Sequence, residues 1–353
     1  MFRRSGGCFF GKILRVDAIV TTRPLAKSPR FRDRPAWAIV LATWAALAAA
    51  GEPPPAASVY SRRADADPSA TASTAVSAPV DPGAGAEDAA AQAERIVASS
   101  LAVIARAESV SLKFRQKARV GDRVLVGTGR YVQSGQGEDQ RFRFDTILEC
   151  DTETFELTEV SDGLFCWTHR HSAEEPAHLE RVDVRRVRAR LAQLGAPDAA
   201  DGAAYLGGLQ RTLRLLRHWF RFTRATAGDL DGVPVWFVDG GWAADYLGIV
   251  LPDLKDRLTR PGAVTPADLP DGVPWSIRLA ISRGDLVLHR IEWLAIPGRR
   301  PVAEAPPEPI AVMELFDVEF GRPVDATAFF YQPAAEGLID VTDMYVSAVS
   351  LMR

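Results

Sequence analysis

The chain has 353 residues, of which 47% are hydrophobic and 25% charged, and its formal net charge is −3. These proportions are typical of a globular protein, and a slightly acidic chain is not the electrostatic partner of bulk nucleic acid. A chain of this length buries enough apolar surface to fold without disulfides or a structural metal.

The first fifty residues carry the pattern of an export signal. Residues 36–51 contain no charged side chain, Arg30, Arg32 and Arg34 precede them, and Ala48-Ala49-Ala50 has the small side chains of a cleavage site. The apolar run is shorter than the roughly 20 residues that a spanning helix needs. We therefore assign 1–51 to a leader that is cleaved near Ala50, with export to the periplasm or cell envelope. A retained anchor is the alternative.

Residues 52–86 are predicted to be a disordered linker. They begin with Pro53-Pro54-Pro55 and continue in Ala, Ser, Thr, Pro and Asp, with almost no large apolar side chain. Such a segment cannot recover its ordering entropy by burial. The folded domain is expected to span residues 87–346.

Helical spacing opens the folded domain, and strand alternation follows it. Ile96, Ser100 and Ile104 lie on one face of a helix predicted from Glu87 to about Ala107. Alternating apolar residues then predict strands around Leu112 and at 124–132, 142–150, 155–160 and 164–170.

Two amphipathic helices are predicted in the middle of the chain, within a helical insertion at 180–224. Their apolar stripes are Val184, Val187, Leu191, Leu194 and Leu209, Leu213, Leu216, Phe220. Antiparallel strands resume at 230–239, 275–282, 286–296 and 309–320. The predicted class is α+β, mainly antiparallel β: one curved sheet or unclosed barrel (half-barrel) wrapped around helices.

Motifs of catalysis are not found in the sequence. There is no Gly-x-Ser-x-Gly elbow, His-Glu-x-x-His pair or P-loop. Gly127-x-Gly129 lies within a strand pattern, where glycine allows close backbone approach or a bulge rather than dinucleotide binding. No enzyme activity and no cofactor are predicted.

A cluster of histidines is the one candidate metal site, and we interpret it as a solvated loop. Its members are His169, His171, His178, Glu174 and Glu175. Zinc binding needs such ligands at a spacing fixed by a helix or turn, and the pattern offers none. A metal-dependent hydrolase is the least favoured function.

Two cysteines follow the leader, Cys150 and Cys166. In an exported protein the simplest expectation is a disulfide. In the predicted meander Cys166 lies two strands away from Thr146, and Cys150 lies four residues further along the strand of Thr146. The Cα atoms of the two cysteines are then separated by roughly 16 Å. A disulfide needs less than about 7 Å, so two buried thiols are predicted.

Arginine is concentrated in the two predicted middle helices, the second of which is expected to extend to Arg224. One interpretation is a surface that binds anionic lipid headgroups or an acidic protein partner. The other is a solvated face on which arginine stems cover apolar surface. The candidate patch consists of Arg185, Arg188, Arg214, Arg217 and Arg221.

The predicted strands offer one continuous apolar face, which lines either a cavity or an ordinary core. Its members are Phe142, Phe144, Leu148, Phe155, Leu157, Ile277, Leu279, Ile281, Phe316 and Val318. An acyl chain is recognised by apolar area, at ~0.8 kcal/mol per buried methylene. A binder of such chains needs an apolar concavity and a movable lid rather than a catalytic constellation.

Five segments occur in an order that resembles a known family. They are Phe114-x-Gln116, Arg141-Phe142-Arg143-Phe144, Val160-Ser161-Asp162-Gly163 with Trp167 after it, Leu230–Val235, and Phe330–Val341. Over Glu87 to Val346 the chain resembles the outer-membrane lipoprotein carrier (LolA-like) superfamily of periplasmic proteins. The resemblance implies an unclosed antiparallel barrel around a hydrophobic cavity with helices as a lid.

Members of that superfamily carry acylated lipoproteins, bind lipids or regulate anti-sigma factors. The resemblance implies that Arg143 bonds the lid, although the proline usual after this strand is missing and the middle segment is longer than in small carriers. The predicted function is an exported, non-catalytic lipid- or lipoprotein-binding protein. The alternative is an envelope sensor or interaction module that binds an acidic partner.

Overall fold

The computed structural model describes residues 82–120, 123–150, 153–173, 177–195, 206–260, 262–270, 272–296, 307–333 and 337–351. The predicted leader, most of the predicted linker, and Glu174 and Glu175 lie outside these ranges. None of the described helices is both long and apolar enough to cross a membrane.

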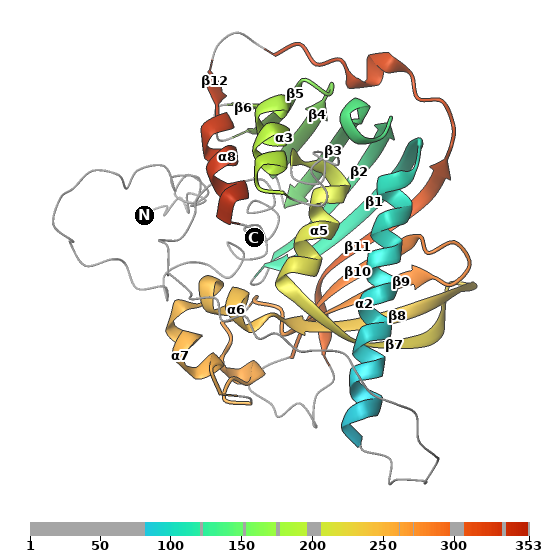
Figure 1. Cartoon of the computed structure of the whole chain (residues 1–353), viewed down its shortest axis with the longest axis vertical. Coiled ribbons are helices and arrows are strands. Elements are labelled where there is room, and N and C mark those ends of the chain that lie inside the picture. The colour runs from blue at the N-terminus through green and yellow to red at the C-terminus, as the bar shows by residue number, and fades with distance from the viewer. Residues whose placement is uncertain are drawn as a thin grey trace, which may run out of the picture.

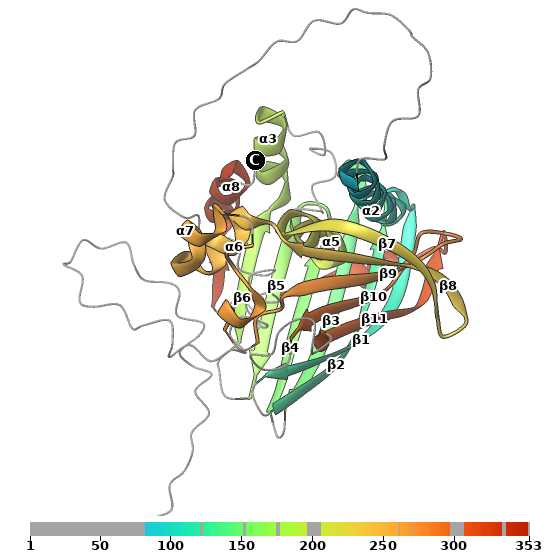
Figure 2. The same ribbon diagram turned by 90° about the horizontal axis from the view of Figure 1, so that it is seen from below.

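A sheet of twelve strands dominates the described structure, in the order β12-β6-β5-β4-β3-β2-β1-β11-β10-β9-β8-β7. The strands are β1 Ser109–Val120, β2 Arg123–Ser134, β3 Arg141–Cys150, β4 Glu153–Ser161, β5 Phe165–Ser172, β6 His178–Asp183, β7 Phe220–Leu230, β8 Val233–Trp242, β9 Ser276–Ser282, β10 Leu288–Ala295, β11 Glu308–Phe320 and β12 Leu338–Asp340. Neighbours pair antiparallel except β12 with β6. The two end strands, β12 and β7, do not pair with each other, so the sheet is an unclosed half-barrel (Figures 1 and 2).

The longer helices lie on one side of this sheet (Figure 2). They are α2 Pro82–Arg106, α3 Val184–Gln193, α5 Gly208–Trp219 and α8 Thr342–Leu351, with the short helices α6 Ala244–Val250 and α7 Lys255–Leu258 between β8 and β9. We call the helix-covered side of the sheet the inner face and the opposite side the outer face. The predicted α+β class, a mainly antiparallel unclosed half-barrel with helices, is confirmed by this architecture.

Two hairpin series build the sheet, and they meet in its middle. Strands β1 to β6 form one antiparallel series and β7 to β11 the other, and they are joined where β1 pairs with β11. The C-terminal strand β12 lies at the far edge, beside β6. The segment between β11 and β12 packs on the outer face, where Tyr331 lies 6.1 Å from Trp167 between ring centroids.

The predicted helical insertion at 180–224 is wrong at both of its ends. Residues 180–183 belong to β6, and Arg221 and Arg224 lie on β7 rather than on a helix. Phe220 and Phe222 are both buried and alternate with exposed Arg221. This period of two is the signal of a strand, and the helical spacing of Leu216 and Phe220 obscured it.

Candidate binding face of the half-barrel

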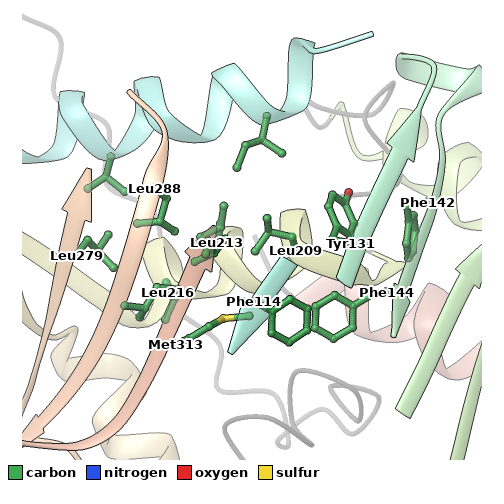
Figure 3. Close-up of a cluster of buried hydrophobic side chains, with 14 of the residues drawn as sticks. Phe114, Tyr131, Phe142, Phe144, Leu209, Leu213, Leu216, Leu279, Leu288 and Met313 are labelled. Carbon is green, nitrogen blue, oxygen red and sulfur yellow. The ribbon is translucent and has the colours of Figure 1, made fainter. Parts of the chain in front are cut away.

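The inner face carries the main hydrophobic core. Five predicted cavity-lining residues lie buried in it, and Leu157 and Val318 pack against it with part of their surface exposed. Figure 3 shows how the aromatic rings of β1, β2 and β3 meet the leucines of α5 and of the β9–β10 region. The five buried residues are Phe142, Phe144, Ile277, Leu279 and Ile281.

Phe316 departs from the predicted apolar face, since 39% of its surface is exposed and it lies outside the core. The register between β1 and β11 shifts at this point, and Asp317 has a left-handed backbone with φ of 50°. Such a bulge reverses the alternation of the strand. Leu315 therefore points into the core.

The predicted continuous apolar face is divided rather than unbroken. Phe155 packs against a second, small cluster made of Leu125 and Cys150, and Leu148 is half-buried outside both clusters. Between the two clusters lies a buried polar pair, in which the Gln116 amide donates to the Thr146 hydroxyl at 3.0 Å. Strand alternation identified the face, but inner polar positions interrupt it.

Helix α5 is buried on nearly every side. Its buried residues run from Gly208 to Leu213 without a break, followed by Leu215 and Leu216. A hydrogen-bond network ties it to the sheet, because Gln210 donates to Gln133 at 2.7 Å and Gln133 in turn donates to the Ile104 carbonyl of α2. Tyr131 also donates to Gln133, at 2.8 Å. Helix α5 is therefore a core helix enclosed by the half-barrel rather than a solvent-facing amphipathic helix.

A buried group of charged and polar side chains lies where α5 and α8 meet β4. Glu159 accepts a hydrogen bond from the backbone N–H of Gly208 at 2.7 Å, at the first residue of α5. Arg211 donates to the Tyr345 hydroxyl at 3.1 Å. Burial raises the pKa of the Glu159 carboxyl, against the opposing influence of Arg211 and the Gly208 N–H. Burial likewise raises the pKa of Tyr345, to about 12.

Two further charged residues border this group on β5 and β6. Arg170 and Glu180 form an ion pair at 3.2 Å, and His178 lies 2.9 Å from the same carboxylate. The pKa of Glu180 stays below its ordinary value, because the hydrogen bond from His178 and the charge of Arg170 outweigh its burial. We call Glu159, Arg170, Glu180, Arg211 and Tyr345 the inner charged cluster.

One sequence signal for the inner charged cluster lies on β4. On β4 the inner positions are Phe155, Leu157, Glu159 and Ser161, so a carboxylate continues an apolar alternation. On α5 Arg211 lies inside a buried run, which only the unusual burial of the helix reveals.

Arg143 does not reach the lid, contrary to what the family resemblance implied. It lies on the outer face with Asp145, whose carboxylate accepts its Nε hydrogen at 2.8 Å. Its neighbours Phe142 and Phe144 point inward. Alternation along a strand places adjacent residues on opposite faces, so an arginine between two core phenylalanines faces away from the helices.

The predicted arginine patch is not one surface. Arg185 is exposed beside Asp183, while Arg188 donates to the Glu138 carbonyl. Arg217 lies 4.0 Å from Glu94 of α2. Arg214 is half-buried on α5, and Arg221 donates to carbonyls at the end of that helix from β7.

The histidine cluster is divided between the two faces of the sheet. His169 pairs with Leu179 and His178 pairs with Arg170 across β5 and β6, so the two imidazoles point to opposite sides. In the described part of the chain no three His, Cys, Asp or Glu residues are placed to hold a metal ion.

Both cysteines are buried free thiols, as predicted. The register differs from the expected one, because Cys166 pairs with Ser161, which pairs with Phe142 rather than Thr146. Cys150 lies at the opposite end of β3. The separation is thus larger than the sequence suggested, and a disulfide is geometrically excluded.

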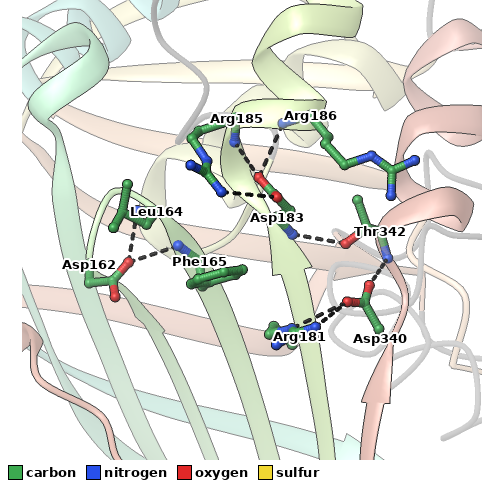
Figure 4. Close-up of polar contacts among 9 residues, drawn as sticks. All are labelled: Asp162, Leu164, Phe165, Arg181, Asp183, Arg185, Arg186, Asp340 and Thr342. Atoms are coloured by element: carbon green, nitrogen blue, oxygen red, sulfur yellow. Dashed lines mark hydrogen bonds and ion pairs between the residues drawn. The ribbon is translucent and has the colours of Figure 1, made fainter.

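The C-terminal segment is attached to β6 and α3 by polar contacts (Figure 4). Arg181 and Asp340 pair at 2.6 Å, and the backbone N–H of Asp183 donates to the Thr342 hydroxyl at 2.9 Å. Asp183 also accepts the backbone N–H of Arg185 and so caps α3. These contacts position α8 so that Tyr345 reaches Arg211 within the inner charged cluster.

No family model and no curated protein matches the chain. Among solved structures, MucB is 12% identical, covers 71% of this chain and 65% of its own, and has a TM-score of 0.34. The lipoprotein LppX of Mycobacterium tuberculosis is 11% identical over 67% of this chain and 98% of its own, with a TM-score of 0.32. A LolA superfamily protein of Nitrosomonas europaea is 10% identical over 68% of this chain and 97% of its own, with a TM-score of 0.25. The fold class is established by the strand order and the unpaired outer strands described above.

Proposed function

We propose that the chain is an exported, non-catalytic protein that binds a lipid or an acylated lipoprotein on the inner face of its half-barrel. The observation that carries this proposal is how the helices that cover the inner face are attached to the sheet. The inner apolar face is covered by α2 and α5 through side chains, whereas all twelve strands pair within one sheet. The cover can therefore move without breaking any backbone hydrogen bond of the sheet.

Acyl chains are suited to replace the contacts that α5 now makes. Leu209, Leu213 and Leu216 of α5 fill the inner face against Phe114 and Met313 (Figure 3). Methylene groups bury the same kind of surface, at ~0.8 kcal/mol each. A chain of about sixteen carbons thus offers on the order of 10 kcal/mol of transfer free energy, which offsets the loss of side-chain contacts where the acyl chain enters between α5 and the sheet. Cleavage of the leader and a flexible tether at 52–86 belong to the same proposal.

The test compares an inner with an outer substitution. Leu157 lies on the inner face and is half-buried, while Ile147 is partly exposed on the outer face, so both variants are expected to fold. We expect acyl lipid in an organic extract of the protein purified from an envelope-containing host, detected by mass spectrometry. Leu157→Gln should reduce the bound lipid and Ile147→Gln should not. A protein without extractable lipid that binds no acyl probe would contradict the proposal.

A second candidate function, binding of an acidic envelope protein, is favoured by helix α3. Its side chains Arg185 and Arg186 are 65% and 56% exposed, and α3 contains no acidic residue. If α3 binds such a partner, Arg185→Glu with Arg186→Glu should abolish its capture from envelope extract. Lys113→Glu with Lys117→Glu on β1 is the matched control, and equal loss in both variants would indicate nonspecific charge binding.

A further inference from the structure

Arg211 has an unused hydrogen-bond donor in the interior of the protein. Only 4% of its surface is exposed, and its Nη1 donates to Tyr345 at 3.1 Å. Its Nη2 has no hydrogen-bond partner among the described residues. A buried donor without a partner is costly and calls for an explanation, such as a ligand that supplies the acceptor.

The carboxylates around Arg211 are engaged elsewhere. Glu159 accepts from the Gly208 N–H, and Glu180 is held by Arg170 and His178. In the described structure neither forms an ion pair with Arg211, although the charge of Arg211 acts to lower the pKa of both. Burial raises the pKa of Glu159. Among the described residues the second guanidinium nitrogen of Arg211 is therefore left without an acceptor.

The same helix connects this donor to the apolar core. Leu209 and Leu213 belong to the core, and Arg211, on another side of α5, contacts Tyr345, which belongs to the same core cluster. A guanidinium group binds carboxylate oxygens with planar, charge-assisted hydrogen bonds. A molecule with a carboxylate at one end and a long hydrocarbon tail is therefore complementary to both parts of the site.

We infer that Arg211 binds the carboxylate of a long-chain fatty acid, or of an acyl ligand ending in a carboxylate, whose tail lies on the apolar inner face. The inference rests on the proposed function and adds the chemistry of the ligand's polar end. Helix α8 covers Arg211 through Tyr345, and it is held by the three-residue strand β12, the Asp183–Thr342 hydrogen bond and partly exposed ion pairs. Entry of the ligand therefore requires movement of α8 rather than of the sheet.

The experiment measures a preference within a pair of ligands. Palmitate and methyl palmitate compete with a fluorescent apolar probe for the delipidated full-length protein at pH 8, where palmitate is ionised. We expect palmitate to bind at least tenfold more tightly than its ester. In Arg211→Met the ratio should fall to about one, because the ester keeps its affinity. Arg217→Met, an exposed change on the same helix, should keep the wild-type ratio.

A second measurement does not depend on the variant being folded. The second measurement follows the ¹³C chemical shift of palmitate labelled at its carboxyl group. In the wild-type complex this carboxyl should remain ionised to a lower pH than the carboxyl of palmitate in detergent micelles. Equal affinities for acid and ester, an unchanged ratio in folded Arg211→Met, or a bound carboxyl that protonates at the micellar pH would overturn the inference alone. Failure of both ligands to bind would overturn the proposed function together with it.

Discussion

The rings of Phe114 and Phe144 stack with centroids 4.9 Å apart and planes 11° apart, although their strands β1 and β3 are not neighbours. Strand β2 runs between them, and Phe114 pairs with Gly129 of that strand. A Cβ atom at Gly129 would lie 2.2 Å from the Phe114 ring. The absence of a side chain on β2 therefore allows the two rings to meet, and the prediction of close approach at Gly127-x-Gly129 is confirmed.

Replacement of Gly129 by alanine should destabilise the fold by about 3 kcal/mol, because an added methyl in a packed core forces its neighbours to move. Rotation of the Phe114 ring does not relieve the contact, since the Asp145 carbonyl oxygen also lies 2.3 Å from the new atom. Urea unfolding measures the effect. Gly241→Ala on β8, which meets open space, is the control and should change stability by less than about 0.5 kcal/mol. Equal effects of the two substitutions would show that the ring stacking does not depend on Gly129.

The buried carboxyl of Glu159 should make stability depend on pH. Its pKa is raised in the folded protein, so the folded state binds this proton more tightly than the unfolded state. The stabilising contribution is complete below the ordinary glutamate pKa and is lost as pH rises through the folded-state value. Glutamine does not titrate, so Glu159→Gln does not lose stability in this way. The free energy of unfolding of the variant, relative to that of the wild type, should therefore increase as pH rises from 4 to 7. A difference that does not vary with pH would show that the carboxyl titrates normally.

The contacts of Asp340 should control local opening of the C-terminal segment. Hydrogen bonding from Thr342 and Arg181 lowers the pKa of Asp340 to about 2, so its contribution is present above the ordinary aspartate pKa and is lost as pH falls toward 2. Because the pair is partly exposed, Asp340→Asn should cost less than about 1 kcal/mol in global stability. Hydrogen exchange at the Val341 and Tyr345 amides should nevertheless accelerate several-fold. Asp317→Asn, which removes an exposed ion pair with Lys113, should leave these amides unchanged.

Cys150 and Cys166 should both be unreactive toward alkylating reagents in the folded protein and both be reactive after denaturation without reductant. Burial raises the pKa of the Cys166 thiol well above its ordinary value, which suppresses the thiolate that reacts. Mass spectrometry of the chain cleaved after the leader should count two labels on the denatured protein. An unlabelled protein whose mass is lower by two hydrogen atoms would reveal a disulfide and contradict the strand register.

The positions of the strands were predictable where side chains alternate. The elements that pack around each strand or helix were not. Phe142 and Phe144 identify β3 and its inner face from the sequence alone, and the leucine spacing of α5 identifies that helix. The burial of Arg211 was not predictable, because the three arginines of α5 ordinarily indicate a solvated face. Only the packing of α8 and the sheet around α5 shows which of them points inward.

The differences from the predicted sheet arise at positions where local and tertiary signals disagree. Phe220 continues the leucine spacing of α5 and yet begins β7. Phe316 continues the alternation of β11, but the backbone of Asp317 reverses it. The parallel pairing of β12 with β6 joins Leu338 to Leu179 across most of the folded domain, and no local pattern encodes such a partner.

The pairing of β1 with β11 means that the sheet can be completed only late in folding, after the C-terminal strands are available. Val110 pairs with Phe320, so the central ladder closes a loop of about two hundred residues. The entropy lost in closing such a loop precedes the gain from its contacts, and folds dominated by distant pairs form slowly. Until the C-terminal strands have emerged, the first hairpin series has an unpaired edge at β1 that is open to other chains. On the proposed export route, a chaperone that binds this unpaired edge is therefore an expected requirement of the protein's biogenesis.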